Sequence, residues 1–408
     1  MELMNQPFTG QLGDRLIELL ESPNFHTLDI AVAFAKNSGV LRIKDSLQKF
    51  RDGGAKVNVY VGVDLGGTSY EALTTLLLHS DTLNVVHSER GQTFHSKIYQ
   101  FSGEKNGLLV VGSHNLTGGG LWTNFESSVH IPTDVANAKE MAVQKGVSDY
   151  FKELVSLKAS FMPITTQEEI DTLLQNDYVS KEVADRVRRA KAAKEDSAHE
   201  RLFGIGAPAK LPRLNPASKE ETAVVSEAHA DVHTPELNDE KQTIWFETRE
   251  MTGGSRNILD LSKKSLVEEG DPTGTPFDLG EAKFMRGGVE FFGLNPTATD
   301  QTKNITLNFE GNDYADNTIL FPEGDKANGT WRLQIKGIDS SNRKITDAFR
   351  AESDAPYLVR KVVTFTRVQG DYYSMSVFPE TELESFKAAS SILARNGQTK
   401  QARFLGLI

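Results

Sequence analysis

The sequence predicts a multidomain protein with an N-terminal α/β domain, a helical connector with a linker, and an all-β C-terminal domain. A length of 408 residues exceeds what one ordinary hydrophobic core supports. Strand-like and helix-like segments alternate in the first part of the chain, which indicates a mixed sheet flanked by helices. After Thr243 short strand-like segments dominate. We expect domains at 1–160 and 243–408, with the connector and linker at 161–242.

The composition is typical of a soluble protein. There is no cysteine, which excludes disulfides and thiolate metal sites and suits the cytoplasm. No run of 18 apolar residues predicts a membrane span, and the first residues do not resemble a secretory signal. The net charge of −11 argues against coating of nucleic acid by the whole surface, but it allows a local basic groove.

The N-terminal domain is expected to begin with repeated strand–helix units, which favour parallel strands. Buried or alternating apolar residues predict strands at 27–34, 56–63 and 83–86, and helical spacing predicts helices at 11–21, 39–50 and 69–78. Three strands then follow without room for helices between them, at 94–101, 107–112 and 124–131. Pro132 to Asp134 is expected to cap a long helix that ends the domain.

Two helical stretches fill 165–195, and the second is highly charged, which is typical of a solvated helix. The composition of the Pro-containing segment 198–242 predicts a linker. Eight short strands then predict a barrel or a sandwich, before a helix at 380–393 and a polar tail. These strands are TIWFET, NILDLS, GVEFFGL, NITLNF, NTILFP, TWRLQIKG, KVVTFTR and YYSMSVF.

The stretch from Phe94 to Glu126 carries the candidate chemistry. If 94–101 is a strand, His95 and Lys97 project from the same face. The next strand runs into a Gly-Ser-His-Asn turn that contains Ser113 and Asn115. Glu126 follows on the third strand.

These residue types suit phosphoryl transfer. A neutral imidazole can attack phosphorus and form a covalent intermediate. A lysine ammonium and an asparagine amide can hold the non-bridging oxygens, and a carboxylate can orient the imidazole. No metal ion or other cofactor is required. Each short motif alone is also common on solvated strands, so the pattern by itself also fits a strand without a catalytic role.

FHSKIYQF followed by LLVVGSHNLTGGG resembles the signature of the phospholipase D superfamily, His-x-Lys and then Gly-Ser-x-Asn. The spacing from His95 to Glu126 is similar to that of its metal-independent restriction-endonuclease branch. The common motif has an Asp five residues after the Lys, where this chain has Ser102. That departure disfavours a lipase and fits the branch in which a later Glu takes the acidic role.

The resemblance implies a role for each motif residue. His95 would form a phosphohistidine, Lys97 and Asn115 would bind the phosphate, Glu126 would support the histidine, and Ser113 would add a hydrogen bond. His87 and His114 do not fit the motif and are interpreted as structural. The chain has one such motif, whereas the mechanism needs two histidines, so the resemblance implies a homodimer with one shared active site.

WFETREMTGGSRNILDLSKKSL resembles the opening of the B-three DNA-binding pseudobarrel of plant transcription factors. The resemblance implies that loops 251–257 and 338–346 grip the major groove of double-stranded DNA. Arg256, Asn257, Asn342 and Arg343 suit base edges. Lys263, Lys264, Arg332 and Lys336 suit phosphates. For each residue a solvated loop charge is the alternative.

The leading hypothesis is therefore a sequence-specific, metal-independent DNA endonuclease of a restriction-modification system. The resemblance allows a cognate methyltransferase and a separate ATP-dependent helicase-like subunit as partners. The chain has no GxxxxGK[ST] loop, so any ATPase must be another polypeptide. Two alternatives remain: a lipid phosphodiesterase, and a DNA-binding regulator with an inactive nuclease-like dimerisation domain.

Overall fold

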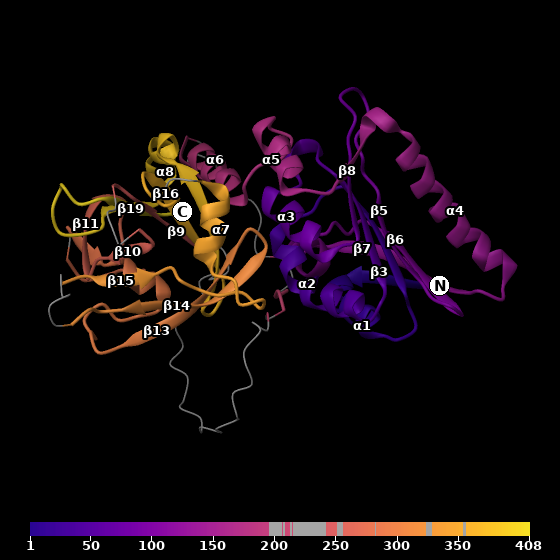
Figure 1. Cartoon of the computed structure of the whole chain (residues 1–408), viewed down its shortest axis with the longest axis horizontal. Coiled ribbons are helices and arrows are strands. Elements are labelled where there is room, and N and C mark those ends of the chain that lie inside the picture. Colours follow the sequence, from indigo (N-terminus) through magenta and orange to yellow (C-terminus); the bar gives the residue numbers. More distant parts are fainter. Residues whose placement is uncertain are drawn as a thin grey trace, which may run out of the picture. The chain divides into compact units, whose positions relative to one another are not determined.

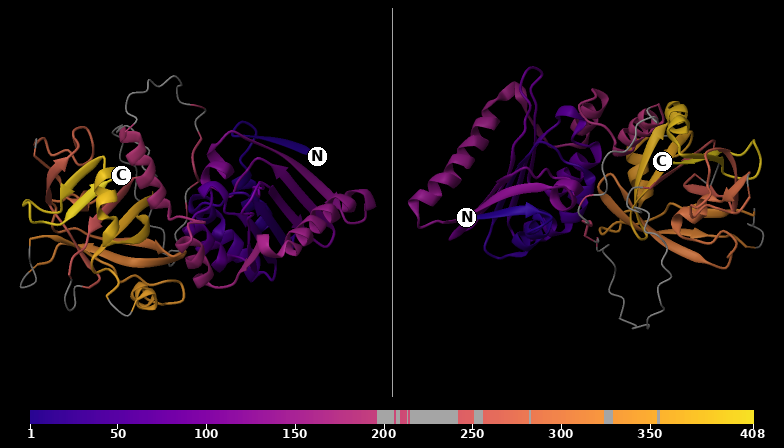
Figure 2. Two further views of the ribbon diagram at one scale, coloured as in Figure 1. Left: turned by 90° about the horizontal axis from the view of Figure 1, so that it is seen from above. Right: turned by 180° about the vertical axis from the view of Figure 1, so that it is seen from behind.

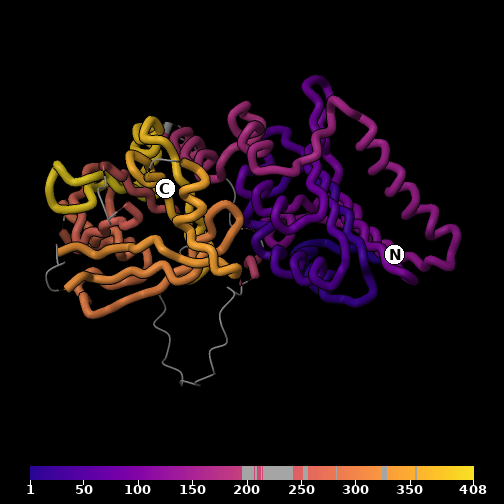
Figure 3. The backbone as a smooth tube through the Cα atoms, in the orientation of Figure 1, coloured from indigo at the N-terminus to yellow at the C-terminus, as the bar shows by residue number. Residues whose placement is uncertain are grey.

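The computed structural model describes residues 1–195, 206, 209–212, 214, 242–250, 256–281, 283–323, 329–353 and 356–408. The chain divides into two compact units, and Figure 3 traces the backbone of each by residue number. The first contains Met1–Glu182 and Arg201–Leu214, and the second contains Val183–Glu200 and Asn215–Ile408.

An eight-stranded mixed sheet forms the centre of the first unit, in the order β1-β7-β6-β5-β2-β3-β4-β8. β2, β3 and β4 are parallel, and the other neighbours are antiparallel. Figure 2 shows β1 at one edge. The strands are β1 Glu2–Gln6, β2 Thr27–Val32, β3 Lys56–Gly62, β4 Thr82–Val86, β5 Lys97–Ser102, β6 Asn106–Gly112, β7 Glu126–Asp134 and β8 Phe161–Ile164.

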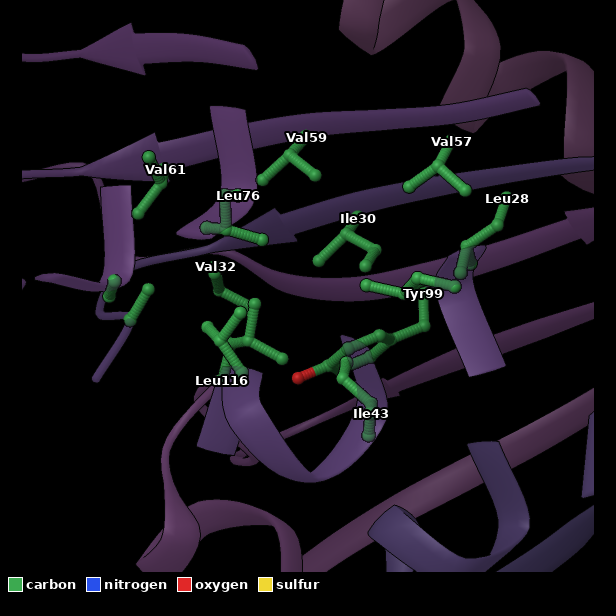
Figure 4. Close-up of a cluster of buried hydrophobic side chains, with 14 of the residues drawn as sticks. Leu28, Ile30, Val32, Ile43, Val57, Val59, Val61, Leu76, Tyr99 and Leu116 are labelled. Atoms are coloured by element: carbon green, nitrogen blue, oxygen red, sulfur yellow. The ribbon is translucent and has the colours of Figure 1, made fainter. Parts of the chain in front are cut away.

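Helices cover both faces of this sheet because its central strands are apolar on both sides. On one face lie α1 (Leu12–Glu21), α2 (Asn37–Asp52), α3 (Tyr70–His79) and α5 (Gln167–Gln175). Their apolar sides close over the aliphatic side chains and Tyr99 drawn in Figure 4. The long helix α4 (Ala138–Ser156) lies on the other face, where Phe151 and Leu154 are buried (Figure 1).

The predicted mixed sheet flanked by helices is confirmed, with three local corrections. β5 begins at Lys97, so His95 precedes the strand. Pro132 to Asp134 complete β7 instead of capping a helix, and the side chain of Asn137 caps α4. β1 and β8 were not predicted, because both are edge strands whose partners lie far away in the sequence.

The second unit contains an eleven-stranded sheet and the helices α7 (Ile345–Glu352) and α8 (Leu383–Ala389). It also contains α6 (Glu182–Glu195) except for the first residue of that helix, Glu182, which belongs to the first unit. The order is β10-β15-β14-β13-β17-β16-β9-β19-β18-β11-β12. The strands are β9 Thr243–Glu247, β10 Ile258–Leu261, β11 Lys264–Glu269, β12 Phe284–Arg286, β13 Thr302–Phe309, β14 Asn312–Leu320, β15 Trp331–Gln334, β16 Lys361–Gln369, β17 Tyr372–Pro379, β18 Ile392–Arg395 and β19 Phe404–Leu407.

The β-rich character of this unit is as expected, but a closed pseudobarrel is not shown. Among the described residues no pairing joins the terminal strands β10 and β12. The predicted strand GVEFFGL is a 3-10 turn over Gly288–Phe292, which ends at Gly293 with a φ of 73°. The predicted helix at 380–393 stops at Ala389, and the polar tail contributes β19.

The expected connector is divided between the units. β8 and α5 pack in the first unit, whereas α6 beyond Glu182 packs in the second, where Val183 and Val187 contact Trp245 and Phe386. The predicted linker at 198–242 lies outside the described residues except for 206, 209–212, 214 and 242, of which Leu211 packs against the first core. No helix in the described part of the chain is long and apolar enough to cross a membrane.

Candidate active site

The residues of the motif meet at one end of the first sheet. β2 and β6 end there, and β5 and β7 begin there, because these neighbours are antiparallel. Lys97 pairs with Val32 across β5 and β2, and Gly112 pairs with Ser128 across β6 and β7. The strand ends therefore bring together side chains that are distant in the sequence.

His95 and Lys97 contact each other directly. The ammonium of Lys97 lies 2.7 Å from Nδ1 and 3.1 Å from Nε2 of His95, and it donates to the carbonyl oxygen of His95 at 3.0 Å. Phe94 and Lys97 are buried, whereas the imidazole between them is exposed. The pair is thus formed although His95 lies outside the strand, and its ring remains open to a substrate.

Lys97 is an unusual lysine because it is 8% exposed and lies at the start of a strand. Burial lowers the pKa of its ammonium, since desolvation disfavours the charged form, and the carboxylate of Glu126 acts in the opposite direction. A cation held with little water around it interacts strongly with an anion that enters the site.

Asn115 is fixed by the loop that leaves β2. Its Oδ1 accepts the backbone N–H of Phe34 at 3.1 Å, and Leu116 N–H donates to the Phe34 carbonyl at 3.0 Å. The ring of Phe34 also lies edge-on to the imidazole of His95, with centroids 6.0 Å apart. Because Oδ1 is occupied, the amide NH₂ of Asn115 is the group left to bind a phosphate oxygen.

Glu126 is held by two neighbours. Its carboxylate accepts a hydrogen bond from the hydroxyl of Ser113 and another from Nδ2 of Asn124 at 3.2 Å. Ser113 also accepts the N–H of Ser127 at 3.1 Å. Within this chain Glu126 is therefore bonded to the turn, and the direct partner of His95 is Lys97.

The Gly-rich segment after the motif contains a helical turn whose backbone is held by Gln6. Gly119–Thr123 form a single π-helical turn. The buried side chain of Gln6 at the end of β1 donates to the carbonyls of Gly119 at 3.2 Å, Gly120 at 3.3 Å and Asn124 at 3.1 Å. Edge strand β1 therefore supports the segment between Asn115 and Glu126.

His114 and His87 both have structural environments. His114 is buried, with its ring nitrogens 2.8 Å from the Gly120 carbonyl and 3.0 Å from the hydroxyl of Ser128. Burial lowers its pKa. His87 pairs with Asp64 at 2.9 Å. Ser102 lies at the far end of β5, opposite Thr27.

Four positions that the sequence interpretation did not single out support the site: Gln6, Phe34, Asp64 and Tyr99. The hydroxyl of Tyr99 donates to the His114 carbonyl at 3.2 Å from within the core (Figure 4), and burial raises its pKa. Alternation along β5 puts Tyr99 on the same face as Lys97, which is the signal in the sequence that could have identified it. The other three act through contacts with distant segments, for which the sequence carries no signal.

Among the described residues no group of three or more His, Asp or Glu side chains is arranged to hold a metal ion.

In the second unit, three of the DNA-binding candidates lie at one end of the β10–β15 pair. The carbonyl of Asn257 accepts the N–H of Ile335, which places Arg256 and Asn257 beside Lys336. Asn342 and Arg343 lie in the loop that follows Ile338. Arg256 is exposed, and no described side chain pairs with it. Arg343 is paired with Asp339 at 2.9 Å but remains 66% exposed.

The other three candidates lie elsewhere or are engaged. Lys263 and Lys264 follow the opposite end of β10, where Lys263 lies over the ring of Phe321 and Lys264 pairs with Glu281 at 2.6 Å. Arg332 lies within β15, 3.9 Å from the carboxylate of Asp260. The expected set therefore contains a cluster of Arg256, Asn257 and Lys336. Three of the other candidates, Lys264, Arg332 and Arg343, have acidic partners.

No protein-family model matches the chain, and no curated protein sequence does. Among solved structures it is similar to NucT from Helicobacter pylori at 17% identity, with a TM-score of 0.28 over 40% of this chain and 98% of that one. It is similar to Nuc from Salmonella typhimurium, a phospholipase D family member, at 13% identity and a TM-score of 0.30, over 40% and 97%. Polyphosphate kinase from Porphyromonas gingivalis matches at 13% identity and a TM-score of 0.25, over 38% and 21%. TM-scores this low support no conclusion about activity. The side chains of the site are the evidence for it.

Proposed function

We propose that the first unit is a metal-independent DNA endonuclease that cuts phosphodiesters through a covalent phosphohistidine on His95. One observation supports this above all: an exposed imidazole lies against a buried ammonium at the strand end that also carries Asn115 and Glu126. A nucleophile and two donors for phosphate oxygens thus lie together.

The reaction would have two displacements. A nitrogen of His95 attacks phosphorus and the bond to the leaving nucleoside oxygen breaks, while a second histidine donates a proton to that oxygen. Water then attacks phosphorus, its proton passes to the second histidine, and the N–P bond breaks. Lys97 and the amide of Asn115 would stabilise the charge on the non-bridging oxygens in both steps.

The second histidine would come from another copy of the chain. The sequence has one His-x-Lys…Asn unit, so a homodimer with a shared site on a two-fold axis supplies the pair. The second unit would recognise double-stranded DNA, with the cluster around Arg256 as the contact surface. Within a restriction-modification system, an ATP-dependent helicase-like subunit and a methyltransferase would be separate chains.

The decisive experiment incubates the purified protein with plasmid DNA in excess EDTA, with and without a candidate ATPase. We expect nicked or linear DNA, complete loss of cleavage in His95→Ala, and unchanged DNA binding. The matched control is His26→Ala, which removes an exposed histidine beside the opposite end of β2. Intact plasmid under all these conditions, or full cleavage by His95→Ala, would overturn the proposal.

A further inference from the structure

Asp64 lies just after the end of β3 and contacts both ends of the loop that precedes the candidate nucleophile. Its Oδ1 is 2.9 Å from Nδ1 of His87, the residue after β4. Its Oδ2 accepts the backbone N–H of Phe94 at 3.1 Å, immediately before His95. One carboxylate therefore closes the loop from His87 to Phe94 at both ends.

Both ends of this loop are anchored further. The backbone N–H of His87 donates to the Ser160 carbonyl at 3.1 Å, and its ring lies edge-on to Tyr178, with centroids 5.2 Å apart. At the other end the ring of Phe94 is buried beside Val86 and Phe151. A Cβ at Gly62 would lie 3.1 Å from the Phe94 carbonyl oxygen, so this part of the backbone packs tightly on the end of β3.

His95 lies outside the sheet because β5 begins only at Lys97, and its imidazole is exposed. On the C-terminal side, the ammonium of Lys97 holds the carbonyl oxygen of His95 at 3.0 Å. On the N-terminal side, Asp64 holds the N–H of Phe94, so this carboxylate fixes the backbone that leads into His95. The Asp64 carboxylate is well suited to this role, since its side chain is only 10% exposed and both of its oxygens have partners.

We propose that Asp64 is a positioning residue that aligns His95 for attack on phosphorus by clamping the 87–94 loop. This rests on the proposed role of His95. Loss of the clamp would leave DNA affinity unchanged and slow the chemical step, because a small displacement of a nucleophile costs about 100-fold in rate.

The test measures single-turnover cleavage and DNA dissociation constants for Asp64→Ala and Asp64→Asn. Asn keeps an acceptor for the Phe94 N–H and an amide that can hydrogen-bond to the His87 ring, so we expect a rate within about threefold of wild type, against a loss of about 100-fold in Asp64→Ala. Hydrogen exchange at the Phe94 amide gives a readout besides activity: protection should fall in Asp64→Ala and persist in Asp64→Asn.

Asp81→Ala is the matched control. Like Asp64, Asp81 bonds to a backbone N–H and to a nitrogen of a second side chain, Val57 at 2.8 Å and Arg51 at 3.1 Å, but at the opposite end of β3. A wild-type rate in Asp64→Ala, or a loss that follows thermal stability equally in both alanine variants, overturns the positioning role. Cleavage by His95→Ala would instead overturn the proposed function, and the exchange experiment would still report whether Asp64 holds the loop.

Discussion

At the scale of single residues, the paired histidine and lysine differ in exposure, and this difference has a chemical consequence. The imidazole of His95 is exposed, whereas the ammonium of Lys97 is 8% exposed. A buried cation has lost most of its hydration, so it is ready to interact with an entering phosphate. The same burial brings its deprotonation closer to neutral pH.

The pH dependence of cleavage should therefore report on Lys97. Its lowered pKa means that the charged form is lost as pH rises, at a lower pH than for an exposed lysine. In Lys97→Arg this alkaline decline should disappear, since a guanidinium stays charged. In Glu126→Gln the residual activity should decline at a lower pH, because Glu126 raises the pKa of Lys97.

Single-turnover rates between pH 6 and 10 would measure this, with Lys97→Met expected to lose roughly 100- to 1,000-fold as for other lost oxyanion donors. Lys105→Arg, at an exposed lysine between β5 and β6, is the control and should keep the wild-type profile. If the cleavage rate of Lys97→Arg declines at the same alkaline pH as that of wild type, deprotonation of Lys97 does not cause the decline.

Gly120 packs closely against the backbone of Asn115. A Cβ there would lie 2.3 Å from the carbonyl oxygen and 2.8 Å from the nitrogen of Asn115, which are backbone atoms that can move little. Gly120→Ala should destabilise the first unit by about 1–3 kcal/mol, as overpacking does, and displace the Asn115 amide from the site. Thermal unfolding and single-turnover cleavage at a temperature well below unfolding would measure the two effects.

The matched control is Gly146→Ala, at an exposed position of α4 with nothing within 4 Å of the new Cβ. It should stabilise the protein by about 0.5–1 kcal/mol, because alanine loses less backbone entropy in a helix than glycine does, and leave cleavage unchanged. Equal behaviour of the two alanine variants would show that the turn tolerates a side chain at Gly120.

At the scale of elements, periodicity located the strands and helices that build the site. Alternation and apolar runs predicted β2 to β7 and α1 to α3 because central strands covered on both faces leave a strong apolar pattern. Edge strand β1 escaped prediction, since Glu2–Gln6 gains its structure from pairing with β7, more than 100 residues away. The helical turn after Asn115 was not predicted for the same reason, since the hydrogen bonds that hold it come from the distant Gln6.

The second unit shows the limit of the same reasoning for binding residues. Residue type alone could not separate Lys264, which pairs with Glu281, from Arg256, which is exposed. Glu281 and Lys264 are adjacent because β11 and β12 form a hairpin across an irregular loop. Surface charges meet through loop geometry, which leaves no periodic signal in the sequence.

At the scale of the whole molecule, a pair of carboxylates lies where the chain passes from the first unit to the second. The N–H of Glu182, the first residue of α6, donates to the carboxylate of Glu71 on α3 at 3.0 Å. The carboxylate of Glu182 in turn accepts from the N–H of Asn37 at 2.6 Å and from the hydroxyl of Ser69 at 2.8 Å. These bonds join Glu182 to the N-terminal ends of α2 and α3 within the first unit.

Glu71 should make the stability of the first unit depend on pH. Burial, with a smaller contribution from the charge of Glu182, raises its pKa from 4.5 to about 7, and Lys181 opposes the shift. The folded state therefore binds a proton more tightly than the unfolded state. Glu71 then destabilises the fold increasingly as pH rises from 4.5 to about 7, and the cost is constant above that.

Glu71→Gln removes this titration while its amide oxygen can still accept the N–H of Glu182. Its advantage in unfolding free energy over wild type should be near zero at pH 4.5, grow through pH 7 and reach up to about 3 kcal/mol at pH 8. Denaturant unfolding across this range would measure the difference, with Glu153→Gln at an exposed position of α4 as the control. A difference that stays constant between pH 4.5 and 8, or that the control reproduces, would mean that Glu71 is already charged or already neutral throughout.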